Sequence, residues 1–345
     1  MIKQHIKEGF LLKSKGYHKR AIEAFYKALE GDNSSEELLL EIADLYYLMG
    51  NEVRSLEYIE QILNQNATHI GALKLIKTIF EKKNALEKAE QTAKNIYFIS
   101  KKTEDLIEIF KLLIKQKKYE EVFEYKSEGA KTDIFYYMAL AKFYMNETNE
   151  AEILINMALD FDKENQDLLL LKGKILLKKN KVEDCIELLN KIEIVDEKPE
   201  THNWAGLVYQ YNFEYQKAIK HFLTAIKFSA SSDEFYYNCA STYFKMGENG
   251  LAKKYYNYAI SLNPDNKNYH FALANLYYSE KHYKRAMEEL NYDFFEARLL
   301  KSIILYDTGY VAIAKKELEQ LEKEQPDNEL LLTYKNKIEE DLKIN

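Results

Sequence analysis

Glycine and proline are scarce in this sequence, which has only 11 and 3 of them among 345 residues. Sheets and long loops need such residues to turn the chain, so their scarcity favours helices joined by short turns. Cysteine is rarer still, and two residues are too few for the disulfide framework of a small secreted domain. No apolar run approaches the length of about 20 residues that a membrane-spanning helix needs.

The remaining composition is that of a folded, acidic protein. Hydrophobic residues make up 46% and charged residues 30% of the chain, which argues against disorder. The net charge of −7 gives no general reason to expect nucleic-acid binding. The N-terminal segment MIKQHIKEGFLLKSKG has no uninterrupted apolar core, so it does not read as a signal peptide. Together with the few cysteines, this predicts a cytoplasmic protein without a membrane span.

A pattern of small and aromatic residues recurs along the chain. Most of MGENGLAKKYYNYAISLNPDN, at 246–266, returns as TGYVAIAKKELEQLEKEQPDN, at 308–328. Ala218, Ala252 and Ala286 are evenly spaced, and a small residue stands at a constant distance before each of them. Small residues let two helices cross closely, so the pattern predicts helix–turn–helix units that stack on one another.

This pattern resembles the tetratricopeptide repeat, a helix–turn–helix unit of 34 residues, over nearly the whole chain. The resemblance implies an all-α fold, an α-solenoid of about ten repeats in a right-handed superhelix, closed by a capping helix at 329–345. We expect one repeat array over 1–345, degenerate at 70–131, where Lys77 and Phe110 replace the usual small residue. The expected repeats are 2–35, 36–69, 70–102, 103–131, 132–165, 166–198, 199–232, 233–266, 267–294 and 295–328.

Two further details of the repeats can be read from the sequence. The repeats 103–131 and 267–294 are shorter than the others, which should shorten their second helices. Ser34 and Ser231 each stand three residues before a glutamate at an expected helix start, the spacing of a capping box.

No arrangement of residues indicates catalysis or a cofactor. The seven histidines lack the spacing of a helical zinc motif, and there is neither a glycine-rich phosphate loop nor a Gly-x-Ser-x-Gly motif. Cys185 and Cys239 fall at packing positions, which favours buried thiols over nucleophiles. We therefore expect no enzymatic activity, no metal site and no cofactor.

In tetratricopeptide repeat proteins the first helix of each unit lines the concave surface, and its fifth, ninth and twelfth positions point into the groove. Carried over to this chain, these positions are mainly aromatic or aliphatic in the later repeats, which suits an extended peptide or an amphipathic helix. The alternative is that the rings pack between neighbouring first helices. The expected partner-binding residues are Tyr136, Phe143, Tyr237, Phe244, Phe271, Asn275, Tyr278, Leu299, Ile303 and Tyr306.

The sequence thus predicts a non-enzymatic scaffold or adaptor that holds a protein or peptide partner in its concave groove. The alternative is a sensor of signalling peptides that lacks its own DNA-binding domain. Sensors with similar repeats usually carry a helix-turn-helix, whereas the first repeat here begins at Ile2.

Overall fold

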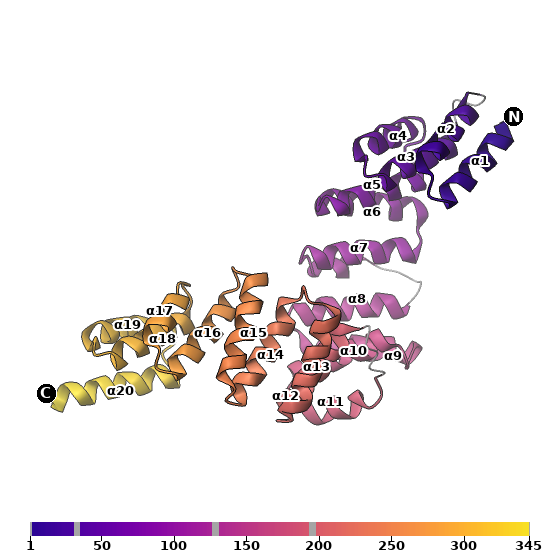
Figure 1. Ribbon diagram of the computed structural model, residues 1–345. Coiled ribbons are helices and arrows are strands. Elements are labelled where there is room, and N and C mark those ends of the chain that lie inside the picture. Colours follow the sequence, from indigo (N-terminus) through magenta and orange to yellow (C-terminus); the bar gives the residue numbers. More distant parts are fainter. Residues whose placement is uncertain (1, 31–34, 126–130, 193–197, 345) are drawn as a thin grey trace. The chain divides into compact units, whose positions relative to one another are not determined.

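The computed structural model describes residues 2–30, 35–125, 131–192 and 198–344 (Figure 1). Within these ranges the regular structure consists of twenty α-helices and one short 3-10 helix, with no strand. The chain forms two compact units, residues 1–175 and residues 176–345. The expected all-α class is confirmed, whereas the repeat boundaries and the single array stay predictions.

In the first unit, consecutive helices pack in pairs joined by short turns, and each pair packs on the next. One helix, α10 (Gln166–Lys178), runs across the boundary between the units. The helices of the first unit are α1 (Ile2–Ser14), α2 (His18–Leu29), α3 (Glu36–Leu48), α4 (Glu52–Gln65), α5 (Ile70–Lys82), α6 (Leu86–Ser100), α7 (Thr103–Lys115), η1 (Glu120–Glu124), α8 (Lys131–Tyr144) and α9 (Thr148–Phe161).

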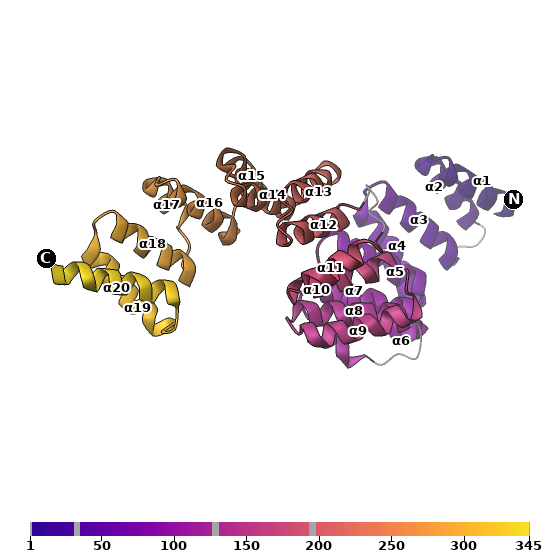
Figure 2. The ribbon, with the colours of Figure 1, turned by 90° about the horizontal axis from the view of Figure 1, so that it is seen from below.

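The second unit follows the same plan and ends with a long helix at the C-terminus. There α18, α19 and α20 lie side by side (Figure 2). Its helices are α11 (Val182–Leu189), α12 (Pro199–Tyr211), α13 (Tyr215–Phe228), α14 (Asp233–Lys245), α15 (Asn249–Leu262), α16 (Lys267–Ser279), α17 (Tyr283–Glu289), α18 (Phe295–Asp307), α19 (Val311–Glu324) and α20 (Glu329–Ile344).

The turn inside each helix pair contains one residue in the left-handed backbone region. Such a residue reverses the chain directly after a helix, and glycine adopts it most easily. The positions are Gly16, Gly50, Asn84, Lys117, Asn146, Asn180, Phe213, Gly247, Lys281 and Gly309. Phe213, with a φ of 62°, is the bulkiest of these residues and therefore the most strained.

The small residues of the repeat leave room for large side chains on the second helix of the pair. A Cβ atom at Gly9 would lie 2.5 Å from the ring of Phe25, and one at Gly206 would lie 2.6 Å from the ring of Phe222. In the degenerate repeat the large side chain is on the first helix and the small one is on the second. The large Lys77 stands at the small position, Ala93 stands where the ring would be, and both line a cavity of about 340 Å³.

The core is a series of small clusters instead of one centre. Each cluster draws its buried residues from a few consecutive helices, for example α14 to α16 or α18 to α20. Such segmentation is typical of repeat arrays, where each unit buries its apolar face on its neighbours. The expected capping helix is present as α20, which buries Leu331 and Ile338.

The two short repeats do have short second elements, as predicted. The 3-10 helix η1 has five residues and α17 has seven, compared with fourteen in α15. Of the two predicted capping boxes, one can be compared with the structure. Ser34 lies outside the described residues, and Ser35 caps α3 by accepting a hydrogen bond from the Leu38 amide at 3.4 Å. At α14 the N-cap is Ser232, whose side chain makes no cap bond, so the prediction for Ser231 is wrong.

Candidate binding surface

Tyr237 and Phe244 lie on the first helix of a pair, α14, and are partly exposed. The ring of Tyr237 stacks on that of Tyr269, with centroids 4.9 Å apart, and touches Tyr256 at 5.8 Å. Phe244 packs against the cluster formed by α14, α15 and α16. Both rings therefore support helix packing and still present part of their surface to solvent.

Of the residues predicted on α16, Phe271 and Tyr278 contact the two ends of α18, and Asn275 bonds within its own helix. The ring of Phe271 meets that of Phe294 edge to face at 5.6 Å. Asn275 donates its amide N–H to the carbonyl oxygen of Phe271 at 3.0 Å. The hydroxyl of Tyr278 donates to Oδ2 of Asp307 at 2.8 Å, and burial together with its hydrogen bonds raises the pKa of this phenol.

The residues predicted on α18 take part in the packing of α18 against α19 and α20. Leu299 and Ile303 are only 4% and 3% exposed and belong to the core cluster that includes Leu331. The hydroxyl of Tyr306 donates to Oδ2 of Asp341 at 2.6 Å, and this bond raises the pKa of Tyr306 to about 12. Leu299 and Ile303 thus contribute to the core, which their position on the first helix did not reveal.

Tyr136 and Phe143 belong to the first unit, on α8, and are also partly exposed. Burial raises the pKa of the Tyr136 phenol to about 12, and its ring lies 5.1 Å from that of Tyr137. Phe143 meets Tyr144 edge to face at 5.7 Å. The other eight predicted residues lie in the second unit, so the ten residues fall into two separate sets.

A buried polar ladder between α12 and α14 was not foreseen. Asn238 donates to Oδ1 of Asn203 at 2.9 Å, and Gln210 donates to Oγ1 of Thr242 at 2.6 Å. All four side chains are buried. Buried amides need such partners, so these residues fix the pairing of the two first helices. Asn203 is the fifth residue of α12 and Asn238 the sixth of α14, so the partners are not at equivalent repeat positions and the repeat pattern did not indicate their pairing.

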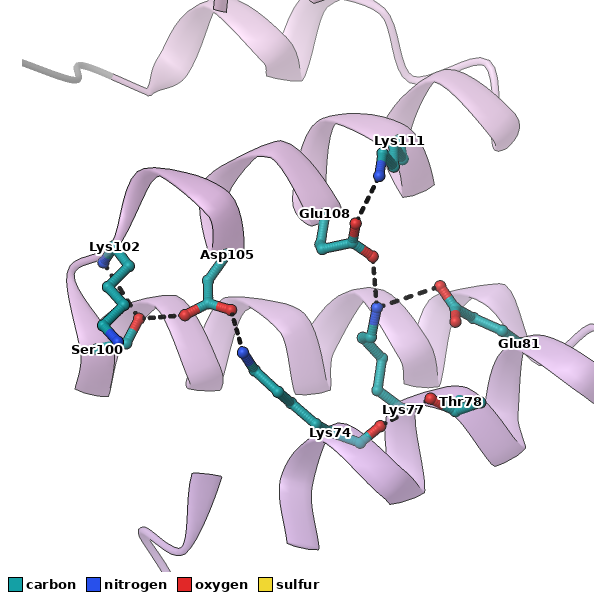
Figure 3. A network of polar contacts seen from close by, with 9 residues as sticks. All are labelled: Lys74, Lys77, Thr78, Glu81, Ser100, Lys102, Asp105, Glu108 and Lys111. Carbon is teal, nitrogen blue, oxygen red and sulfur yellow. Dashed lines mark hydrogen bonds and ion pairs between the residues drawn. The ribbon is translucent and has the colours of Figure 1, made fainter. Parts of the chain in front are cut away.

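A second unforeseen feature is a charged network between α5 and α7 in the first unit (Figure 3). Nζ of Lys77, which is almost fully buried, lies 2.6 Å from Oε2 of Glu108 and 3.5 Å from Oε1 of Glu81. Nζ of Lys74 lies 2.9 Å from Oδ1 of Asp105. Burial alone would raise the pKa of Asp105, but a hydrogen bond from Ser100 and the charge of Lys74 outweigh it and lower that pKa.

This network surrounds the cavity of about 340 Å³, whose apolar lining comes from Ala93 and Ile96 of α6. Each of its central charges already has a partner of opposite sign within the protein (Figure 3). The arrangement therefore joins α5 to α7 electrostatically. The sequence marked Lys77 as a departure from the repeat, but gave no indication of its partner Glu108, which lies in the next repeat.

No arrangement suited to catalysis stands out among the described residues. Cys185 and Cys239 are both buried, and burial raises the pKa of their thiols to about 11 and about 12, which disfavours the nucleophilic thiolate. In the described ranges, no group of three or more His, Cys, Asp or Glu side chains is placed to hold a metal ion. Likewise, none of the described helices combines the length and apolar character required to cross a membrane.

Comparisons with known proteins agree with this architecture. A family model described as "TPR repeat" matches residues 214–247, and one described as "Tetratricopeptide repeat" matches residues 233–266. A search of curated proteins found no significant match.

Two solved structures illustrate the similarity of fold. A structure of the APC/C hetero-tetramer Cut9–Hcn1 matches with a TM-score of 0.63 and 9% identity, covering 98% of this chain and 76% of that one. PilF from Pseudomonas aeruginosa matches with a TM-score of 0.51 and 16% identity, covering 60% of this chain and 97% of that one. The two family models thus identify tetratricopeptide repeats within residues 214–266, and the other described helices share their architecture of stacked helix pairs with a left-handed residue in each turn; such repeats serve as scaffolds for protein–protein interaction.

Proposed function

We propose that this protein is a non-enzymatic scaffold that holds a peptide or helix of a protein partner along the first helices α14 and α16. The observation that carries the proposal is the row of partly exposed rings Tyr237, Phe244 and Phe271 on these helices. Each ring is fixed on one side by packing, so little side-chain entropy is lost when a partner covers the other side.

Polar groups next to these rings support the same proposal. Asn275 uses its amide N–H within its own helix, and its carbonyl oxygen is suited to accept a hydrogen bond from a peptide backbone. The Tyr278 hydroxyl is already committed to Asp307, so we assign Tyr278 a structural role at the edge of the surface. A groove of rings with few polar groups favours an apolar segment flanked by polar residues.

The proposal can be tested by photo-crosslinking in the source cells. A photoreactive phenylalanine analogue placed at position 275 should capture a partner, whereas the same analogue at the exposed Val53 of α4 should not. Changing Phe244 and Phe271 together to Ala should lower the yield at position 275 at least tenfold, because aromatic anchors contribute about 2 kcal/mol or more each. Circular dichroism of the double variant shows whether its helices remain. An unchanged yield in a folded variant would overturn the site.

The alternative function, a sensor of signalling peptides, uses the same groove but a different partner. The captured species distinguishes the two, since a sensor would crosslink to a short free peptide and a scaffold to a protein. We expect the partner in the cytoplasm, on the sequence argument that the chain has few cysteines.

A further inference from the structure

Three successive first helices of the second unit, α12, α14 and α16, carry a tyrosine at their eleventh position. These residues are Tyr209, Tyr243 and Tyr277. The Tyr277 ring lies between two second helices, because its centre is 5.7 Å from Nζ of Lys253 on α15 and 5.8 Å from Cζ of Arg285 on α17. At the same position α18 has Leu305, whose side chain is smaller than a phenol ring. The space between α17 and α19 therefore lacks the ring that the preceding repeats have.

A cavity of about 660 Å³ lies beside Leu305. Leu305 and Ile304 of α18 line it, together with Tyr283 and Met287 of α17 and with Tyr310, which precedes α19. Tyr310 is 60% exposed, so the cavity can be reached from solvent. Its volume is within the range of small-molecule sites, and its aromatic, aliphatic and thioether lining suits an aromatic ring.

Two opposite charges of α17 also line this cavity. Lys284 and Glu288 are exposed and four residues apart, so they lie on one face of the helix. Neither has an ion-pair partner among the described residues, and a lysine before a glutamate is the weaker order for pairing within a helix. In the smaller cavity of the first unit, by contrast, the charges of Lys77 and Glu108 are already paired (Figure 3). The larger cavity thus offers both a cation and an anion to a ligand.

We propose that this cavity binds a free aromatic amino acid. The ring of the ligand occupies the space beside Leu305 that a tyrosine occupies in the preceding repeats. Its carboxylate accepts a hydrogen bond from the Lys284 ammonium group, and its own ammonium group donates one to the Glu288 carboxylate. An aromatic side chain of a protein partner would supply the ring without these two charges. The free amino acid is favoured because it satisfies both Lys284 and Glu288.

The site is independent of the proposed function, because none of the groove residues Tyr237, Phe244 and Phe271 lines the cavity. A small ligand held in an open cavity binds weakly, so we expect a dissociation constant of about 0.1–1 mM. The ligand contacts both α17 and α18, and saturating concentrations should therefore raise the melting temperature of the protein.

The test is a fluorine NMR titration of para-fluoro-L-phenylalanine with the full chain. Its N-acetyl derivative lacks the ammonium group and its amide derivative lacks the carboxylate, so each should bind about threefold or more weakly. Lys284→Gln should weaken binding of the amino acid by a similar factor and leave the amide derivative unaffected. Glu288→Gln should weaken binding of the amino acid and leave the N-acetyl derivative unaffected. Both changes are at exposed positions, where substitutions have little effect on folding.

Leu305→Tyr tests the cavity itself, because it restores the ring of the preceding repeats. This variant should bind the amino acid about tenfold more weakly or not at all. The matched control is Leu330→Tyr on α20, an exposed position away from the cavity lining, which should bind as wild type does. Circular dichroism shows whether the variants are folded.

Any of three results would overturn the proposal. The first is no binding of para-fluoro-L-phenylalanine to wild type at concentrations up to about 10 mM. The second is binding that neither Leu305→Tyr nor the two charge variants weaken. The third is equally tight binding of the derivative that carries both the N-acetyl and the amide group, which would indicate the side chain of a protein partner instead of a free amino acid.

Discussion

The close crossing of α12 and α13 provides the most direct test of how this repeat packs. A methyl group at Gly206 would lie 2.6, 2.8 and 2.9 Å from three ring atoms of Phe222, closer than carbon atoms can approach. Phe222 is fully buried beside Ala218 and Cys239, so its ring has little room to move. Overpacking of this kind costs about 1–3 kcal/mol. Replacing a helical glycine by alanine gains about 1 kcal/mol, so Gly206→Ala should destabilise the protein by up to about 2 kcal/mol.

The matched control is Gly250→Ala on α15, where no heavy atom lies within 4 Å of the added methyl group. That change should stabilise the protein by up to about 1 kcal/mol through helix propensity alone. Urea denaturation followed by far-ultraviolet circular dichroism measures both variants. If Gly206→Ala is as stable as Gly250→Ala, the glycine is not required by the Phe222 ring, and the size argument for the repeat is refuted.

Three further predictions concern other parts of the fold. Lys77→Ala and Ala93→Phe should each destabilise the protein by about 2 kcal/mol, through lost ion pairs and overpacking respectively. Together the two changes recreate the small–aromatic pair. In urea denaturation, the loss of unfolding free energy in the double variant should therefore be smaller than the sum of the losses in the two single variants, by about 1 kcal/mol or more. Phe213→Gly should stabilise the protein by about 1 kcal/mol in urea denaturation, because it relieves a left-handed backbone at a residue that is 79% exposed. Burial and the neighbouring His202 lower the pKa of His221 from 6.5 to about 4, so the unfolded chain binds this proton first as the pH falls. Stability should therefore drop by about 1–2 kcal/mol between pH 7 and pH 5, and His221→Gln should flatten this dependence.

The predicted binding residues show how far a repeat pattern can be read. The sequence placed Tyr237 and Phe271 on first helices, and the structure leaves both partly exposed there. It placed Leu299 by the same rule, but that side chain is buried in the cluster that α18 forms with α19 and the capping helix α20. The rule gives the face of a helix, and what covers this face depends on the next element. In this case the next element is a cap instead of another full repeat.

The sequence by itself determined the helical class and predicted helix–turn–helix units. Both depend on local features, such as the scarcity of glycine and proline and the recurrence of small residues at positions like Gly206. Only the tertiary structure decided which side chains meet between repeats. Lys77 pairs with Glu108 from the next repeat, and Asn203 pairs with Asn238. Such contacts depend on how far each helix pair is rotated against the next and on the volumes that must be filled between them, and neither is a property of any one segment.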